Sequence, residues 1–279
     1  MIRRILIPLD HSPYSEAAVD YGCFIAKQHK VELTGLAVLD IPGIEKSVGP
    51  VPVGGSFYAK KLREDKKKDA LDQIEALLAN FKEKCQKEGV ICRESGKQGS
   101  PSDEIFKISM FYDIAIMGLR THFNFEEEQN GGDSLDKIIN HSITPILAVP
   151  DHFSDPSKTK NVLIPFNGSL PATRALQRFV QLPEAAMFDV TILVSDENMD
   201  VGNYYLDQAE AYLKAYSFKN ITKKWTPDNI IDAMEKIYYE QADLVVAGMH
   251  SKKGFLDFLI GSLSKFLIRK AEKPVLLGQ

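Results

Sequence analysis

Short apolar runs alternate along the chain with stretches that have helical spacing. The runs lack the apolar–polar alternation of a half-exposed strand, so they predict strands that are buried on both faces, as in a parallel sheet covered by helices. Segments 69–88 and 262–272 carry apolar residues on one helical stripe, and Gly89 follows the first of them as a typical helix end. The predicted strands of the first half are Ile5–Leu9, Leu33–Leu39, Val90–Glu94, Asp113–Gly118 and Pro145–Val149.

The same pattern occurs twice in one order. Residues 3–12 read RRILIPLDHS, and residues 160–169 read KNVLIPFNGS. Two later segments also match, YDIAIMG with ADLVVAG and TPILAVP with KPVLLGQ. Ordered self-similarity of this kind indicates a duplicated unit. We therefore predict an α/β protein with two tandem domains, 1–150 and 160–279, each an open five-stranded parallel sheet with helices on both faces.

One stretch of the first half has no strong counterpart in the second. Residues 41–59 read IPGIEKSVGPVPVGGSFYA and are rich in glycine and proline, which predicts a long loop after the second strand. A surface excursion is one interpretation of this loop. A lid, or a contact with the other domain, is the alternative. Residues 151–159 are polar and contain Pro156, as expected of a linker.

Composition narrows the classes of function. The 279 residues carry 34 basic and 38 acidic side chains, a net charge of −4, which gives no reason to expect nucleic-acid binding. The three cysteines show no CxxC spacing and predict reduced thiols in a cytoplasmic protein. No apolar run approaches the ~18–20 residues of a membrane span, so we expect no membrane association.

Candidate chemistry gathers where strands end. In open parallel sheets, ligands bind beyond the carboxyl ends of the strands. In the second half, Gly248 ends a predicted strand, and Gly261-Ser262 opens a predicted helix. A glycine permits close approach of a phosphate, and a helix start offers free N–H donors together with a favourable dipole. Lys252 and Lys253 lie between them and could neutralise phosphate charge.

These residues resemble a known signature. The spacing Gly-x-x-Gly, nine residues, Gly-Ser/Thr is the nucleotide-binding signature of the universal stress protein family, and the strand I-L-I/V-P-x-D that opens each repeat is also similar to that family. The resemblance covers the whole chain and implies two flavodoxin-like domains of the adenine nucleotide alpha hydrolase-like kind. It implies ATP, with or without Mg²⁺, as the ligand. In family members that bind ATP, the strand-one aspartate and the end of strand two hold the adenosine, and the glycine-rich segment holds the phosphates.

Carried over to this chain, the resemblance places the first-choice site in the second half. Ser251 stands where the second glycine of the signature would be, and Asn167 stands in place of the aspartate. An asparagine keeps hydrogen-bonding capacity but loses the charge. The predicted site consists of Asn167 and Val194 at the adenosine end, with Gly248, Ser251, Gly261 and Ser262 around the phosphates.

The first half gives a second-choice site. It keeps the aspartate, as Asp10, but Thr121 replaces the second glycine of the signature, and Gly132 replaces the hydroxyl. Glu126, Glu127 and Glu128 lie in the intervening run, where carboxylates would oppose a triphosphate unless a metal intervenes. The residues of this site are Asp10, Val38, Gly118, Thr121, Gly131 and Gly132.

Three functions stay open at this point. The first is a stress-response protein that binds ATP and acts as a sensor or a partner-binding regulator. The second is an interaction module that has lost its nucleotide site. The third is a weak ATP hydrolase, although no positioned set of catalytic residues and no metal-ligand spacing such as HxxxH is present in the sequence.

The resemblance also implies how the two halves pair. In the family, last strands often pair across a two-fold axis. The corresponding segments here are Ile146–Val149 and Val275–Leu277. Because exposed apolar edges invite aggregation, we predict an antiparallel contact between them. The chain would then be an intramolecular pseudo-dimer, with further homodimerisation and a protein partner left open.

Overall fold

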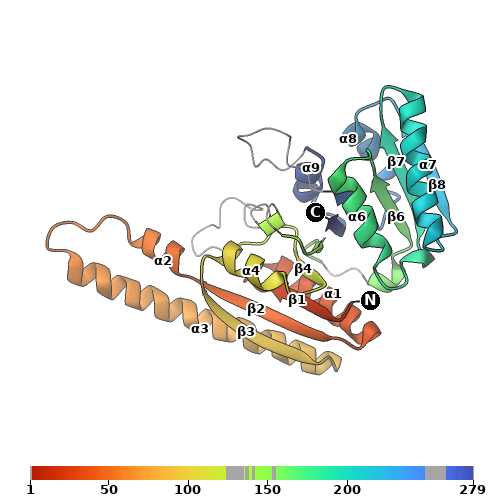
Figure 1. Ribbon diagram of the computed structural model, residues 1–279. Helices are drawn as coiled ribbons and strands as arrows, with labels where there is room; N and C mark the ends of the chain where they lie inside the picture. The colour runs from red at the N-terminus through yellow and green to blue at the C-terminus, as the bar shows by residue number, and fades with distance from the viewer. Residues whose placement is uncertain are drawn as a thin grey trace.

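The computed structural model describes residues 2–123, 135, 138–139, 142–152, 155–248 and 262–278. Within this part of the chain, ten strands form one sheet in the order β3-β2-β1-β4-β5-β10-β9-β6-β7-β8 (Figure 1). The first half contains β1 (Arg4–Pro8), α1 (Pro13–His29), β2 (Glu32–Asp40), α2 (Ile41–Val48), α3 (Ser56–Glu88), β3 (Cys92–Gly99), α4 (Pro101–Ser109), β4 (Ile114–Gly118) and β5 (Ile146–Val149).

The second half follows a short 3₁₀ turn, Pro156–Lys158. Within the described residues, its strands and the helices between the first four of them follow the order of the first half, without a counterpart of α2. They are β6 (Asn161–Pro165), α6 (Leu170–Val180), the 3₁₀ turn Ala185–Met187, β7 (Asp189–Ser195), α7 (Met199–Ala215), β8 (Ile221–Thr226), α8 (Ile230–Ala233), the π-helical turn Met234–Tyr238, β9 (Leu244–Gly248), α9 (Ser262–Lys270) and β10 (Val275–Gly278).

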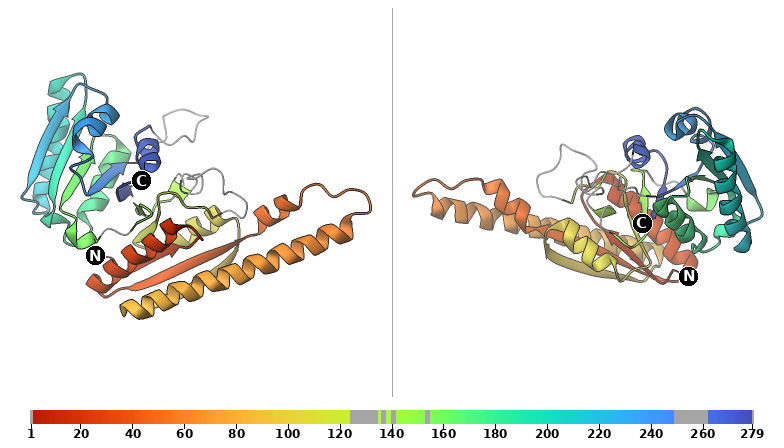
Figure 2. Two further views of the ribbon diagram at one scale, coloured as in Figure 1. Left: turned by 180° about the vertical axis from the view of Figure 1, so that it is seen from behind. Right: turned by 45° about the horizontal axis from the view of Figure 1, so that its top comes forward.

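Each half is a five-stranded parallel sheet, which confirms the predicted α/β fold. The two sheets join edge to edge through β5 and β10, which pair antiparallel with Leu147 opposite Leu276. The predicted contact between the last strands is thus confirmed. The two halves lie on either side of this seam in Figure 2. Pairing the two apolar strands with each other leaves neither as a free edge.

Helices cover both faces of the sheet. Side chains alternate along β1, so that Ile5 and Ile7 belong to one buried cluster and Leu6 to another. The first cluster includes side chains of α1, α3, α6 and α7, and the second includes side chains of α4, α8 and α9. Each cluster runs through both halves, so the core is continuous across the seam. None of the helices in the described residues is long and apolar enough to cross a membrane.

The matched sequence motifs have the same local role in both halves. Asp113 lies just before β4, and one of its carboxylate oxygens accepts the backbone N–H groups of Arg3 and Arg4 at 2.7 and 2.9 Å. Asp243 lies just before β9 and accepts from Lys160 and Asn161 at 2.9 and 2.8 Å. These bonds fix the start of the first strand of each half against its fourth strand.

The first helices also begin alike. Ser12 caps α1, where its hydroxyl accepts the N–H of Ser15, and Ser169 caps α6, where its hydroxyl accepts the N–H of Ala172. Pro13 and Pro171 lie in the first turn of these helices, where the missing N–H of proline has no intrahelical partner to lose.

The predicted loop 41–59 is wrong over most of its length. Residues 41–48 form α2, which Asp40 caps by accepting the N–H of Gly43 at 3.0 Å. The helix expected over 69–88 begins at Ser56, so only residues 49–55 connect α2 to α3. Beyond the sheet, α2 and the N-terminal half of α3 project as an arm, which is orange in Figure 1. We call residues 41–69 the arm.

The third strand also differs from its prediction. It covers Cys92–Gly99, whereas the sequence pattern indicated Val90–Glu94. Most side chains of β3 are exposed or half-buried, because it is an edge strand of the sheet. An apolar run is therefore a poor guide to where this strand ends.

Candidate functional site

A cavity of about 800 Å³ opens at the carboxyl ends of β1 and β2. Its wall combines the turn between β1 and α1, the last residues of β2, one side of α3 and the residues after β4. This is the edge of the sheet at which parallel α/β proteins bind ligands. The volume lies within the range of about 300–1,000 Å³ that small-molecule sites occupy.

Asp10 organises the polar side of this cavity. It is 5% exposed, and one carboxylate oxygen accepts the N–H and the hydroxyl of Ser12 at 3.0 and 2.5 Å. The other oxygen accepts the backbone N–H of His122 at 2.6 Å. Asp10 thereby links the β1–α1 turn to the segment that follows β4. A carboxylate has about four acceptor positions, so these three bonds leave capacity for one more donor.

The opposite wall is apolar. Val38 at the end of β2 lines it, together with Ile74 and Leu77, which belong to α3. Asp40 closes the same end of the cavity, where it caps α2. Among the described lining residues, Asp10 and Asp40 are acidic, and none is a lysine or an arginine. The cavity suits an uncharged, partly apolar ligand group better than an anionic one.

Gly118 and Thr121 lie beside α1. A Cβ at Gly118 would stand 2.2 Å from the Cβ of Tyr14, so the glycine is required for the approach of α1 to the end of β4. Burial raises the pKa of Tyr14, with Arg120 opposing this rise and Asp151 adding to it. The Thr121 side chain is buried, and its hydroxyl has no hydrogen-bond partner among the described residues.

The structure places only part of the first-choice site. Asn167 follows β6 and is exposed, and its side-chain oxygen accepts the N–H of Ser169 at 3.1 Å. Ser262 is exposed at the start of α9. A Cβ at Gly248 would stand 2.3 Å from the backbone N of Ala172 in α6. Ser251 and Gly261 lie outside the described residues, as do Gly131, Gly132, Lys252, Lys253 and Glu126 to Glu128 of the sequence prediction.

Val194 faces away from the expected ligand. The β1–β2 register pairs Pro8 with Leu36, and the β6–β7 register pairs Pro165 with Leu193. The counterpart of Val38 is therefore Ser195. Val194 is one residue earlier, and a shift of one residue turns a strand side chain to the opposite face. Its side chain is fully buried in the cluster that packs against α6 and α7, so only its main chain could meet a ligand.

Other groups at this edge of the second half already have partners. The Ser195 hydroxyl donates to the carbonyl of Asp228 at 2.6 Å, and the Trp225 indole N–H donates to the carbonyl of Asp196 at 3.0 Å. The ends of β7 and β8 are thus tied to neighbouring turns. The corresponding end of β2 leads instead into α2 and the cavity.

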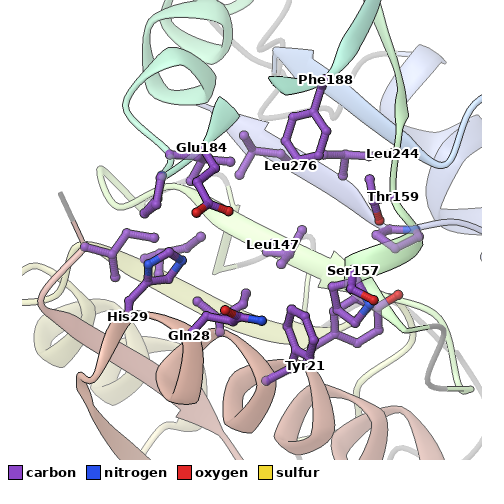
Figure 3. Close-up of a pocket in the computed structure, with 18 of the residues that line it drawn as sticks. Tyr21, Gln28, His29, Leu147, Ser157, Thr159, Glu184, Phe188, Leu244 and Leu276 are labelled. Carbon is purple, nitrogen blue, oxygen red and sulfur yellow. The ribbon is translucent and has the colours of Figure 1, made fainter. Parts of the chain in front are cut away.

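A second cavity, of about 390 Å³, lies at the seam between the halves. Leu147 and Leu276 form part of its floor, while Gln28, His29 and Glu184 lie at its sides (Figure 3). It contains no residue of either predicted site. Ile2, Ile114 and Leu244 also line it, which places it toward the amino ends of the strands and away from the expected ligand edge.

The described residues contain no group of three or more histidine, cysteine, aspartate or glutamate side chains placed to hold a metal ion. The three cysteines are free thiols. Cys23 and Cys85 are buried with their sulfurs 4.0 Å apart.

Fold and site together define a class: two-domain α/β proteins with a duplicated doubly wound domain and a small-molecule cavity at the strand ends. The chain belongs to the universal stress protein family, since the model described as "Universal stress protein family" matches residues 1–150 and 158–277. It carries two such domains in tandem.

Individual relatives agree with this assignment. Universal stress protein Slr1230 of Synechocystis is 24% identical over 99% of each chain. In fold, the chain resembles the crystal structure of a universal stress protein from Archaeoglobus fulgidus, with a TM-score of 0.74, 19% identity and coverage of 99% and 98% of the two chains. A putative universal stress protein from Pseudomonas aeruginosa has a TM-score of 0.63 at 13% identity, with coverage of 99% and 93%.

Proposed function

We propose that this protein binds an adenine nucleotide and acts as a ligand-dependent regulator within the stress response. The nucleoside part of the ligand occupies the first-half cavity between Asp10 and Val38. The observation that carries the proposal is this cavity, at the strand ends, with one polar and one apolar wall. The proposal reverses the order of the two sites that the sequence suggested, because the first half contains the described cavity.

Each wall suits one part of a nucleoside. A purine ring is flat and largely apolar on its faces, so it packs against the apolar lining, to which β2 contributes Val38 and α3 contributes Ile74 and Leu77. The ribose hydroxyls donate to the acceptor capacity that remains on Asp10. A hydrogen bond to a carboxylate is stronger than one between two neutral groups.

The phosphates require another place. Asp10 and Asp40 give the cavity negative charge, and phosphate groups inside it would be repelled. We therefore place the phosphates outside the cavity, at its mouth. Mg²⁺ bound to the phosphates would lower this repulsion. The second half, with Asn167, Gly248 and Ser262, is the alternative site for the same ligand.

The reduced thiols fit a cytoplasmic location, which we include in the proposal. A regulator that does not convert its ligand needs only a change in its own surface when the ligand binds. The cavity wall formed by α3 is continuous with the arm, so an occupied cavity and an empty one would differ in the support they give to the base of the arm.

The test is isothermal titration calorimetry with ATP and with adenosine on the full chain. The variant Val38→Trp fills the cavity from the end of β2, and Ser195→Trp places the same side chain at the register-matched position of the second half. We expect at least a tenfold loss of adenosine affinity for Val38→Trp and less than a twofold change for Ser195→Trp.

The opposite pattern, with loss only in Ser195→Trp, would assign the ligand to the second half. No heat of binding for either ligand with the unmodified protein would overturn nucleotide binding and favour the interaction module. Circular dichroism and urea unfolding of both variants separate loss of the site from loss of the fold.

A further inference from the structure

The arm exposes apolar side chains at its tip. Val51 and Val53 lie in the connection between α2 and α3, and Phe57 and Tyr58 lie in the first turn of α3. Phe57 is 70% exposed and Tyr58 is 76% exposed, with ring centroids 5.8 Å apart. Exposed aliphatic and aromatic groups that cluster at a projecting point are unusual on a protein surface, and they mark an interaction site.

The shaft of the arm is basic. Residues 41–69 contain seven lysines and arginines against four acidic residues, a net charge of +3 in a chain whose total is −4. The remainder of the molecule therefore carries −7. Lys66 is turned inward, where its ammonium donates to the Ser47 hydroxyl at 2.7 Å and ties α3 to α2. The other basic side chains of 60–68 are exposed: Lys60, Lys61, Arg63, Lys67 and Lys68.

Packing explains why the arm holds its shape without covering its tip. Ile44 of α2 and Ala70 of α3 are buried together against Leu39 of β2. This small cluster anchors the base of the arm to the sheet. Toward the tip, which projects away from the sheet in Figure 1, α3 has no such cluster among its described residues, and its large apolar side chains are exposed.

We propose that the arm docks on an anionic lipid surface. Val51, Val53, Phe57 and Tyr58 would enter the interfacial layer, and the lysines and arginine of 60–68 would lie over the anionic headgroups. Apolar side chains beside a cluster of four to eight basic residues are the features that hold a peripheral protein at such a surface. The absence of a membrane-spanning helix among the described residues does not bear on this mode of binding.

Shape favours a lipid surface over a second copy of the chain. At the tip, Phe57 and Tyr58 meet edge to face, and Val51 and Val53 lie in the neighbouring connection. A bilayer accepts apolar groups in any lateral arrangement, whereas a protein partner must supply a pocket for each. The acidic remainder of the molecule would be repelled by the same lipid surface, so the arm is the part that can approach it.

Vesicle sedimentation tests the proposal. The full-length protein is mixed with vesicles of phosphatidylcholine and phosphatidylglycerol in equal parts, or of phosphatidylcholine alone, at 50 and 500 mM NaCl. We expect binding to the anionic vesicles at 50 mM salt, at least tenfold weaker binding at 500 mM salt, and no binding to the neutral vesicles.

Two arm variants have matched controls. The first replaces Lys60, Lys61, Lys67 and Lys68 with glutamine, and its control replaces four exposed lysines outside the arm, Lys158, Lys219, Lys224 and Lys236. Because each basic residue near the surface changes the partition coefficient by about fivefold, the arm variant should lose at least tenfold more affinity than its control.

The second pair is Phe57→Ser with Tyr58→Ser, against Phe111→Ser with Tyr204→Ser. The control aromatic residues are 70% and 59% exposed and lie outside the arm. We expect only the arm pair to weaken binding to anionic vesicles. Equal loss in variant and control, or no sedimentation with anionic vesicles at low salt, would overturn the proposal.

Sedimentation velocity of the protein without lipid completes the test. A dimer that becomes a monomer when Phe57 and Tyr58 are replaced, with no vesicle binding by the unmodified protein, would assign the tip to a contact between copies instead. The proposal does not depend on nucleotide binding, because the vesicle experiment is done without nucleotide.

Discussion

A glycine ends the fourth strand of each half. Its role is either structural, to allow a helix to pack closely, or functional, to let a phosphate approach the backbone. The sequence suggests that Gly248 lets a phosphate approach the backbone. In the structure, the first turn of α6 already occupies that position. The substitution Gly248→Ala tests which role holds.

The expected cost follows from the distances. An added Cβ at Gly248 would lie 2.3 Å from the backbone N of Ala172 and 2.4 Å from the backbone C of Pro171, where ordinary contact begins at 3.4 Å. Because both neighbours are backbone atoms, no side-chain rotation can relieve the overlap, and α6 must move outward by about 1 Å. Overpacking of this kind destabilises a protein by about 1–3 kcal/mol, so we expect a value near 3 kcal/mol.

Urea unfolding followed by circular dichroism measures this change, with Gly96→Ala as the control. The atom nearest to a Cβ added at Gly96 would be a methyl carbon of Leu78, 4.0 Å away. Gly96 lies in β3 with an ordinary strand backbone, which alanine can also adopt. Its replacement should change stability by less than about 1 kcal/mol, because the loss of unfolded-state freedom is then the main effect.

One result would refute the structural role. If Gly248→Ala keeps the unfolding midpoint of the unmodified protein and loses ATP binding in the calorimeter, the glycine serves the phosphates. Loss of stability in Gly248→Ala and in Gly118→Ala, with Gly96→Ala unaffected, supports close helix packing in both halves.

Three further predictions concern single side chains. Thr121→Val removes a buried hydroxyl that lacks a partner among the described residues, so thermal unfolding should show unchanged or slightly higher stability; a loss of more than about 1 kcal/mol would contradict this. Burial raises the pKa of Tyr239 to about 12, against about 10 in the unfolded chain, so stability should fall between pH 10 and 12 by up to about 2–3 kcal/mol. Urea unfolding at pH 9 and 11.5 should show a smaller fall for Tyr239→Phe, and equal falls would disprove the assignment. Asp113→Ala and Asp243→Ala each remove the acceptor of two backbone N–H groups, so each should lower the urea midpoint by an amount equivalent to about 1–2 kcal/mol, with unequal effects arguing against equivalent roles.

The repeat was the most informative feature of the sequence. Motifs that match in order predict equivalent structural positions, and Asp113 with Asp243 shows why, since both residues make the same pair of backbone hydrogen bonds. The antiparallel seam could also be predicted, because each half ends in an apolar strand that would otherwise form a free edge.

The sequence did not reveal the arm, because glycine and proline residues indicated a loop and because the first residues of α3 lack an apolar stripe. Glycine and proline in 41–59 indicated a loop, yet Asp40 followed by Ile41 and Pro42 is also a helix start with proline in its first turn. The first residues of α3 carry no apolar stripe, because they pack against little, so periodicity could not reveal that they are helical.

The sequence could indicate the edge of the sheet where a cavity lies, but it could not rank the two candidate sites. The sequence placed ligand residues at strand ends, where the first-half cavity lies. It could not show that Val194 faces the core, since the assignment depends on a register of one residue. Nor could it show that Asp10 already accepts three hydrogen bonds, because His122 is distant along the chain.

The continuous sheet has a consequence for how such a molecule can change over evolutionary time. In a pairing of two separate identical chains, any substitution alters both sides of the seam at once, and dilution separates the partners. Here, residues 151–159 join β5 to the second half. The two halves therefore always pair one to one, and their effective concentration for each other stays high however dilute the protein is. One half can then acquire a feature such as the arm while the other half does without it. Every molecule then carries one half with the arm and one half without it.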